Sequence, residues 1–481
     1  MRYTGVWNDL TRKMGYWVDM NDPYVTYENK YIESVWWLLK NIYDKGLMYK
    51  GYTIQPYSPA AGTGLSTHEL NQPGCYKNVK DNTAVAMFEL VESSKLKVES
   101  LVGNKLDGKV YFLAWTTTPW TLPSNTALAV GKDIEYVLVE TLDRFSNPLN
   151  KINVILAKNL FNTYFDLTGI ENVELKPGLV KVSEGNPTAS TKKLSQFTVL
   201  QIFNGSDLVG LQYHQLLPYA QPIPPSPRER GPGGEAAFRV IAGDFVTTED
   251  GTGIVHIAPT FGADDMRVAK EAGVPPMLVP DDYGKPVPLV DLRGKFRKEM
   301  QDDLFGFAGE FVKEQYLNDD EIKAETEKQK LKLKKSNGGY IEDTSSLIYQ
   351  SVDERIIKKL ELEGKLFKKE KYEHNYPHCW RTDKPVLYYP LDSWFIKIPA
   401  VRERMVELNK TINWKPESTG TGRFGNWLES ANDWNLSRSR YWGIPLPVWR
   451  SEDGEEKCIG SAEELKNECA KSVSAGLMKT N

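Results

Sequence analysis

Three adjacent threonines are the first residues of this chain that could do chemistry. Thr116, Thr117 and Thr118 follow a predicted strand over residues 110–114, and Pro119 forbids that strand to continue inside a sheet. Hydroxyls and free backbone amides at a strand end can hold a carbonyl or a sugar hydroxyl and orient a water. No base is adjacent, so none of the three is an obvious nucleophile. The alternative is that threonine is simply a good strand residue.

A histidine and two carboxylates form the second candidate. Residues 253–258 predict a strand in which His256 interrupts an apolar face, and a helix is predicted over residues 264–272. One of Asp264 and Asp265 is expected to cap that helix, whose amino end favours an ionised carboxylate. The other could then bind an ammonium group. The alternative for His256 is a satisfied core histidine.

Composition limits the classes of protein that this chain can represent. The 481 residues carry a formal net charge of -4, which does not suggest a general nucleic-acid binder, so any such contact must use local patches. The four cysteines form no C-x-x-C pair, which argues against a structural zinc site and a disulfide framework. Without a signal peptide or a long apolar run, we expect a soluble, cytoplasmic protein that does not enter a membrane.

The pattern of elements predicts a mostly β fold of the α+β class. Strand patterns between about residues 83 and 263 are typical of a barrel-like, strongly curved sheet with peripheral helices. An amphipathic helix is predicted over residues 24–45, and the Gly- and Pro-rich residues 51–85 predict a long ordered loop or linker. The predicted strands are residues 84–90, 110–114, 136–140, 153–156, 198–203, 238–246 and 253–258.

The same patterns suggest three parts. We expect an N-terminal stem segment over residues 1–85, a central domain over residues 86–374 and a return segment over residues 375–481 that ends in a polar tail. The two outer parts are expected to form a smaller mixed stem, or else to be partly disordered. Both ends look cut, and the aromatic residues 427–449 predict an apolar surface for a part of the protein outside this chain.

Two further segments are unusual in composition. Residues 218–234 hold six prolines and predict an irregular surface loop. The lysine-rich residues 328–335 predict a solvated helix face or a mobile loop. The alternative for these lysines is contact with a phosphate backbone.

The two candidate stretches together resemble the editing domain of the isoleucyl-tRNA synthetases. Trp-Thr-Thr-Thr-Pro-Trp-Thr-Leu-Pro-Ser-Asn at residues 115–125 is similar to the family pattern, as is Gly-Thr-Gly-Ile-Val-His-Ile-Ala-Pro with the later Asp-Asp pair at residues 251–265. Valyl and leucyl enzymes carry related versions, but His256 is more similar to the isoleucyl one. Flanking segments that resemble the family are residues 31–37, 45–51 and 433–447.

The resemblance implies hydrolysis of valine wrongly attached to the isoleucine tRNA, at the ester on the terminal adenosine. Asp265 would hold the α-ammonium, and Thr116, Thr117 and Thr118 would line the site and help to position a water. His256 would exclude isoleucine by size. A metal is not expected, so the water would be activated by its position and by a ribose hydroxyl of the substrate. The other expected substrate-binding residues are Asn125, Trp120, which shapes the edge or simply packs, and Asp264.

The resemblance also implies partners. They are the acceptor end of the isoleucine tRNA, the valine that it carries and the rest of the synthetase, with Arg438 and Arg440 as candidates to touch tRNA in the intact enzyme. The His-x-Gly-His and Lys-Met-Ser-Lys-Ser signatures are missing. ATP and magnesium are therefore assigned to the parent ligase, and neither a cofactor nor aminoacylation is expected for this chain. The alternatives are a tRNA acceptor-end binding module without hydrolysis and the editing domain of a valyl enzyme.

Overall fold

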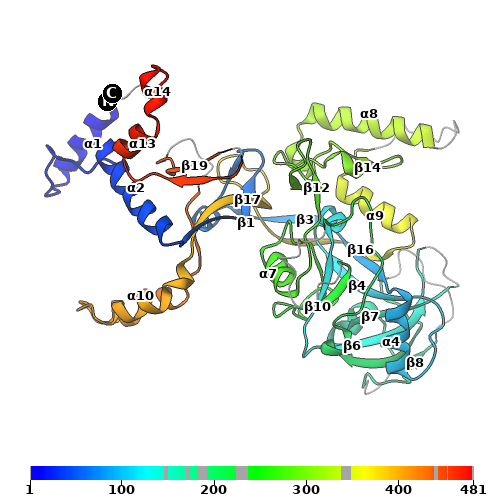
Figure 1. Cartoon of the computed structure of the whole chain (residues 1–481). Helices are drawn as coiled ribbons and strands as arrows, with labels where there is room; N and C mark the ends of the chain where they lie inside the picture. The colour runs from blue at the N-terminus through cyan, green and yellow to red at the C-terminus, as the bar shows by residue number, and fades with distance from the viewer. Residues whose placement is uncertain are drawn as a thin grey trace. The chain divides into compact units, whose positions relative to one another are not determined.

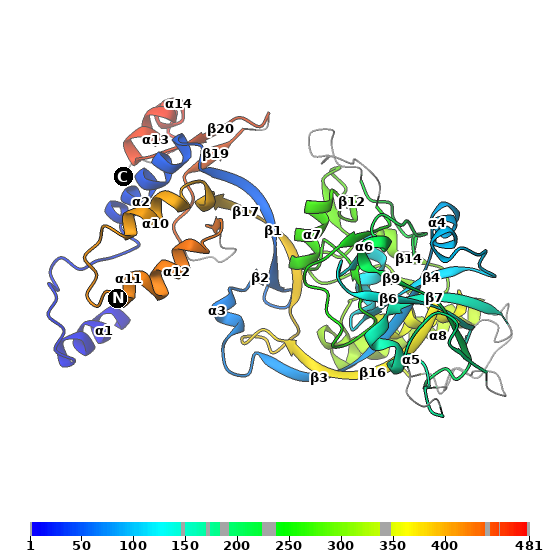
Figure 2. The same ribbon diagram turned by 90° about the horizontal axis from the view of Figure 1, so that it is seen from below.

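The chain divides into two compact units in its computed structural model. One unit holds Met1–Tyr52 and Asp392–Asn481, and the other holds Thr53–Leu391. These boundaries differ from the expected ones near residues 85 and 374. The reason is that the strands at both places, β3 (Tyr76–Glu89) and β16 (Leu366–Pro377), pair with each other and so belong to one unit (Figure 2). The structure describes residues 2–145, 150–169, 174–182, 192–223, 237–336, 348–437, 443–451 and 453–478.

Residues 51–85 are not the long loop that their glycines and prolines predict. They contain most of β1 (Met48–Ser58), the short helix α3 (Thr67–Leu70) and the first part of β3. The β3–β16 ribbon is antiparallel, and its register begins with Tyr76 opposite Pro377. A partner almost three hundred residues away thus satisfies the backbone of β3, and local composition carries no information about such a partner.

The larger unit contains a ten-stranded mixed sheet. The strand order is β10-β5-β11-β4-β7-β6-β9-β8, with β3 paired to β4 and β16 paired to β3. The end strands β10 and β8 do not pair with each other within the described residues, and the expected barrel is not confirmed. Strand β10 instead bridges from Arg239 to Gln212, and Tyr213 bridges to Leu90, just beyond the end of β3. The other strands of the sheet are β4 (Val110–Thr116), β5 (Ala127–Val130), β6 (Glu135–Leu142), β7 (Lys151–Ala157), β8 (Val180–Lys181), β9 (Phe197–Asn204), β10 (Arg239–Ala242) and β11 (Ile254–Ile257).

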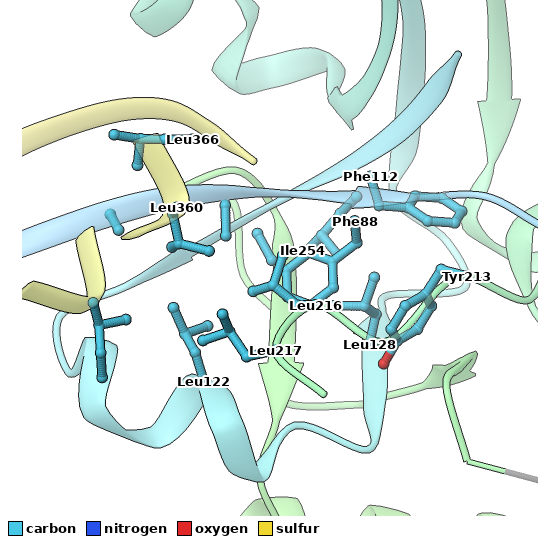
Figure 3. Packing of buried hydrophobic residues seen from close by; sticks show 14 of the residues in the cluster. Phe88, Phe112, Leu122, Leu128, Tyr213, Leu216, Leu217, Ile254, Leu360 and Leu366 are labelled. Carbon is cyan, nitrogen blue, oxygen red and sulfur yellow. The ribbon is translucent and has the colours of Figure 1, made fainter. Parts of the chain in front are cut away.

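Apolar side chains cover both faces of this sheet. Phe112 of β4 belongs to one core cluster and the next residue, Leu113, to another, as expected from the alternation of side chains along a strand. Figure 3 shows part of the first cluster, in which Leu122 and Leu360 are packed. Leu122 belongs to the short 3-10 helix η1 (Pro119–Ser124) and Leu360 to α9 (Val352–Leu362). The core therefore joins α9 to the turn that follows the threonines.

Most of the predicted regular elements are present. The helix expected over residues 24–45 is α2 (Asn29–Asp44), and the helix expected over residues 264–272 is α7 (Ala263–Ala272). Gly273 ends α7 with a φ of 71°, a left-handed conformation that suits glycine. Each of the seven predicted strands overlaps an observed one.

The remaining helices of the larger unit lie around the sheet. The lysine-rich residues belong to α8 (Asp319–Ser336), where Lys328 and Lys330 pair with Glu325 and Glu327 (Figure 1). Paired strands also occur outside the large sheet. They are β2 (Thr63–Gly64), which pairs with β1, β12 (Leu278–Pro280), which pairs with β13 (Pro286–Pro288), and β14 (Gln301–Asp302), which pairs with β15 (Gly306–Phe307). The other α-helices are α4 (Glu92–Val102), α5 (Phe161–Tyr164) and α6 (Gly205–Leu208), and the strand β17 (Leu387–Ile396) begins in this unit.

The smaller unit is mostly helical. It exposes large aromatic side chains, among them Trp7, Trp17, Trp37 and Trp427. Arg438 and Arg440 lie outside the described residues, as does most of the predicted loop at 218–234. Across the described part of the chain, the search for a helix long and apolar enough to cross a membrane finds none. The elements of this unit, besides α2, are α1 (Arg2–Lys13), α10 (Arg402–Asn409), α11 (Ser418–Thr421), α12 (Arg423–Glu429), β18 (Trp434–Asn435), β19 (Val448–Arg450), β20 (Glu456–Cys458), α13 (Ala462–Glu468) and α14 (Ala470–Ser474).

Candidate functional site

The two candidate stretches meet at one edge of the large sheet. Strands β4 and β11 are parallel neighbours, with Trp115 paired to Val255. Because parallel strands end at the same edge, the residues that follow them are brought together. The turn before β11 approaches Trp115 so closely that a Cβ on Gly251 would lie 2.8 Å from the indole ring. A cavity of about 390 Å³ lies at this edge, and its lining includes Thr116, Thr117, Thr118, Thr121, His256 and Asp265.

The threonine turn is held by its own hydrogen bonds. The Thr118 N–H donates to Thr116 Oγ1 over 3.0 Å, and Thr121 Oγ1 donates to the Thr118 carbonyl over 2.8 Å. Pro119 begins the 3-10 helix η1, at a position where proline loses no hydrogen bond. The expectation of free backbone amides is therefore wrong for Thr118. The turn therefore presents the side-chain hydroxyls of its threonines to the cavity.

The uncharged side chain of His256 forms part of the lining of the cavity. It is buried at the end of β11, and Nε2 lies 3.2 Å from Thr121 Oγ1. Since the Thr121 hydroxyl already donates to Thr118, it must accept from Nε2–H, which leaves Nδ1 as the acceptor nitrogen. Nδ1 has no hydrogen-bond partner among the described residues. Burial lowers the pKa of His256 to about 4, so the ring is uncharged at neutral pH.

Asp265 points back from α7 toward the end of β11. Its Oδ2 accepts a hydrogen bond from the Ala258 N–H over 2.8 Å. Gly262 makes room for the carboxylate, because a Cβ there would lie 2.5 Å from Asp265 Cγ. Burial raises the pKa of Asp265 to about 7, and the charge of Asp264 acts in the same direction. Burial thus outweighs the helix amino end, contrary to the expectation of a readily ionised carboxylate.

Neither aspartate caps α7 as expected. The residue before the helix is Gly262, and no side-chain cap is formed there. Asp264 is exposed, with 67% of its side chain accessible, and pairs with Arg267 over 3.6 Å. It does not line the cavity. The structure thus brings only Asp265 of the pair into the candidate site.

Asn125 and Trp120 are also outside the lining. Asn125 is buried and binds the backbone, with Nδ2 donating to the Ala127 carbonyl over 2.7 Å and Oδ1 accepting from the Tyr213 hydroxyl. Trp120 is buried and packs against Phe261, with ring centroids 5.0 Å apart. Trp120 thus packs against a residue that lines the cavity, whereas Asn125 holds the backbone at the start of β5.

Thr121 and Asp250 are among the lining residues that had not been predicted. Thr121 joins His256 to the threonine turn, and the signal for it was present, because residues three apart in a 3-10 helix lie on one face and Thr118 precedes Thr121 by three. Asp250 lies at the rim, where it accepts a hydrogen bond from the Tyr372 hydroxyl over 3.1 Å. Tyr372 comes from β16, so no local pattern could have indicated this contact.

The cavity combines two carboxylates, those of Asp265 and of Asp250 at its rim, with one neutral imidazole and several hydroxyls. Its volume lies in the range of small-molecule sites. A search of the described residues for clusters of three or more His, Cys, Asp or Glu that could hold a metal finds none. A carboxylate can bind an ammonium group, hydroxyls can orient a water, and a neutral ring can limit the size of a side chain. This arrangement suits the hydrolysis of a small amino-acid derivative.

Comparison with known proteins assigns the chain to a family. The family model for class I tRNA synthetases (I, L, M and V) matches residues 1–479. The isoleucine–tRNA ligase of Cytophaga hutchinsonii is 59% identical over 478 residues, which are 99% of this chain and 38% of that protein. The isoleucine–tRNA ligase of Bacteroides fragilis is 53% identical over 497 residues, or 100% of this chain and 38% of that protein. The chain thus spans about 38% of the length of these relatives.

A solved structure also aligns with part of the chain. It is the editing domain of the cytosolic leucyl-tRNA synthetase of P. falciparum, which covers 39% of this chain and 63% of its own, at 13% identity and a TM-score of 0.26. A superposition at that level supports no argument, so the family assignment rests on the sequence matches.

Proposed function

Because this chain belongs to the class I tRNA synthetases of the isoleucine, leucine, methionine and valine group, we propose that it is an editing domain. Its reaction is the hydrolysis of valine from wrongly charged isoleucine tRNA. The observation that carries the proposal is the meeting of Asp265, the threonine turn and His256 in one cavity. An editing site must bind an α-amino group, hold an ester and a water, and reject the correct amino acid. Asp265 suits the first of these tasks, the threonine turn suits the second and His256 suits the third.

Asp265 is the proposed anchor of the substrate. Its carboxylate binds the α-ammonium of the aminoacyl ester, and this positive charge lowers the pKa that burial has raised. The hydroxyls of Thr116, Thr117 and Thr118 hold the ester and terminal ribose and position a water. The water oxygen bonds to the carbonyl carbon, the bond from that carbon to the ribose oxygen breaks, and the ribose oxygen receives the proton that the water gives up. Valine and a tRNA with a free terminal hydroxyl result.

His256 is the proposed size filter. Its side chain is buried and uncharged, because burial lowers the pKa of the ring to about 4, and the one hydrogen bond of that side chain within the described residues goes to Thr121, which holds the ring in place. A valine side chain fits beside the ring, whereas the extra methylene of isoleucine collides with it. The isoleucyl synthetases are themselves the standard example of why a second, smaller site is needed.

The proposal extends to the parent protein. The parent ligates isoleucine to its tRNA with ATP and magnesium in the cytoplasm, and this chain supplies the correction of errors. Its partners are the acceptor end of the tRNA and the rest of the synthetase. The similarity to isoleucine–tRNA ligases over almost the whole chain supports this assignment.

The direct test is deacylation by the whole chain. Preformed valyl and isoleucyl esters of the isoleucine tRNA are incubated with the purified protein, and the loss of labelled amino acid is followed. We expect hydrolysis of the valyl ester at least tenfold faster than that of the isoleucyl ester, because a methylene in a tight pocket is worth about 1–3 kcal/mol. Binding of the tRNA is measured in parallel by filter retention.

Each other outcome supports an alternative. Measurable binding without hydrolysis of either ester would indicate an acceptor-end binding module. Preferential hydrolysis of a threonyl ester on valine tRNA would indicate an editing domain of the valyl type. No particular observation in the structure favours either alternative.

The pH dependence follows from the pKa of Asp265. Burial places it at about 7, and only the ionised form binds the ammonium group. The value of kcat/KM reports the free protein and the free substrate, so it should rise with pH through about 7 and fall again at about pH 8, where the α-ammonium group of the substrate loses its proton. We expect it to be roughly fivefold lower at pH 6 than at about pH 7.4, after subtraction of spontaneous hydrolysis. In Asp265→Asn the residual activity should lack this rise with pH; the same rise in that variant would assign it to another group.

A further inference from the structure

A buried ion cluster that does not line the cavity contacts the helix η1, which follows the threonines. Lys313 is 4% exposed at its side chain, and its Nζ lies 3.2 Å from Asp81 Oδ2 and 3.8 Å from Asp353 Oδ2. The ammonium also lies over the ring of Tyr376, 4.9 Å from the centroid. His374 Nε2 approaches Asp81 at 3.3 Å. Taking such a set of charges out of water costs desolvation energy, so their pairing is weak evidence that the cluster stabilises the fold.

Asp353 links this cluster to the candidate site. Its Oδ1 accepts a hydrogen bond from the Trp120 backbone N–H over 2.8 Å, while Oδ2 faces Lys313. The two oxygens are thus divided between the turn and the ammonium. Trp120 is the second residue of η1 and follows the threonines after Pro119 alone. The first N–H groups of a helix have no partner within that helix, so Asp353 supplies one from another element.

Helix α9 fixes the position of Asp353. Ser351 caps α9 by accepting from the Glu354 N–H over 3.2 Å, and the Glu354 side chain in turn accepts from the Ser351 N–H over 3.0 Å. Asp353 lies in this first turn, but burial raises the pKa of its carboxyl to about 7, against the opposing effects of Lys313 and of the Trp120 N–H. Leu360 of α9 and Leu122 of η1 also belong to one core cluster (Figure 3). The helix is therefore joined to η1 by the Asp353 hydrogen bond and by apolar packing.

We propose that Asp353, oriented by Lys313, is a positioning residue for the editing reaction. By holding Trp120 it sets the place at which the Thr118 and Thr121 hydroxyls face the cavity. It touches neither substrate nor water, and the inference rests on the proposed hydrolysis. Loss of Asp353 leaves the ammonium anchor Asp265 in place, so binding is retained while the water is poorly held. The signature is a fall in kcat with little change in KM.

The test compares three variants of the whole chain. Asp353→Ala removes the acceptor of the Trp120 N–H, whereas Asp353→Asn keeps an oxygen for it and removes the charge. Arg355→Met is the matched control, because Arg355 lies on the same helix, is buried and pairs with Glu310 instead of the turn. Kinetic constants for the valyl ester are corrected for the folded fraction, measured by thermal melting. Hydrogen exchange of peptides covering residues 115–124 is measured by mass spectrometry as a readout independent of activity.

We expect Asp353→Ala to lower kcat about tenfold with KM within twofold of the parent value, and to speed exchange at the turn. Asp353→Asn should recover kcat to within threefold, and Arg355→Met should melt earlier with unchanged kcat and unchanged exchange at the turn. Equal losses in Asp353→Ala and Arg355→Met, or no recovery in Asp353→Asn, would overturn the positioning role. If the chain without substitutions hydrolyses no ester, the proposed function fails. The hydrogen-exchange data alone then decide whether Asp353 holds the turn.

Discussion

Replacing Asp265 with alanine should lower kcat/KM for the valyl ester about 100-fold or more. The carboxylate is the only acidic group that we assign to the substrate, and truncating one partner of a desolvated charge pair costs about 2–5 kcal/mol. The variant also loses the acceptor of the Ala258 N–H, so part of the effect could arise from a shifted strand end. Single-turnover deacylation measures the loss, and Asp265→Asn separates its causes, since the amide oxygen can still accept from Ala258.

Asp264→Ala is the matched control for this experiment. It removes the same group from the neighbouring residue of α7, but that side chain is exposed and faces Arg267. We expect its kcat/KM to stay within twofold of the parent value. If the two alanine variants lose activity alike, or if Asp265→Asn behaves as the parent chain does, Asp265 is not the ammonium anchor.

Replacing His256 with alanine should open the site to isoleucine. The ring walls the cavity, and its removal makes room for the methylene that is proposed to exclude the correct amino acid. We expect hydrolysis of isoleucyl ester to rise roughly 10- to 100-fold, in line with the 1–3 kcal/mol that a methylene is worth in a pocket. Hydrolysis of the valyl ester should fall by no more than about fivefold, because a neutral wall makes no charged contact with the ester.

The control for this substitution is another buried histidine. His378 is buried as well, with Nδ1 2.9 Å from the Tyr376 carbonyl, and it does not line the cavity. His378→Ala should leave the ratio of valyl to isoleucyl hydrolysis unchanged even if the protein melts earlier. A loss of both activities in His256→Ala, without new activity on isoleucyl ester, would show that the histidine serves hydrolysis and is no size filter.

Much of the local structure could be predicted from the sequence. The helices α2 and α7 and the seven strands follow from periodicity and from glycine at the helix ends, which are properties of neighbouring residues. Two departures from the predictions involve distant partners. Residues 51–85 lie partly in strands because β16 pairs with β3, and the expected barrel is not confirmed because the end strands β10 and β8 do not pair with each other within the described residues.

The candidate site was likewise predicted only in part. The threonines, His256 and Asp265 could be named because residue type and position at a strand end suffice to suggest a polar site. The sequence could not separate Asp265 from Asp264, since two adjacent helix residues differ only in the direction in which they point. It also could not show that the side chains of Asn125 and Trp120 lie outside the lining of the cavity.

The sequence by itself thus determined which groups are available: a turn of hydroxyls, one histidine and one acidic pair beside glycine-rich bends. Only the tertiary structure decided their chemical state. Burial raises the pKa of Asp265 and lowers that of His256, because desolvation depends on every element packed around a group. The same holds for Asp353, which meets Trp120 across 233 positions of the chain. Contacts of that range arise from packing, and no local pattern of residues encodes them.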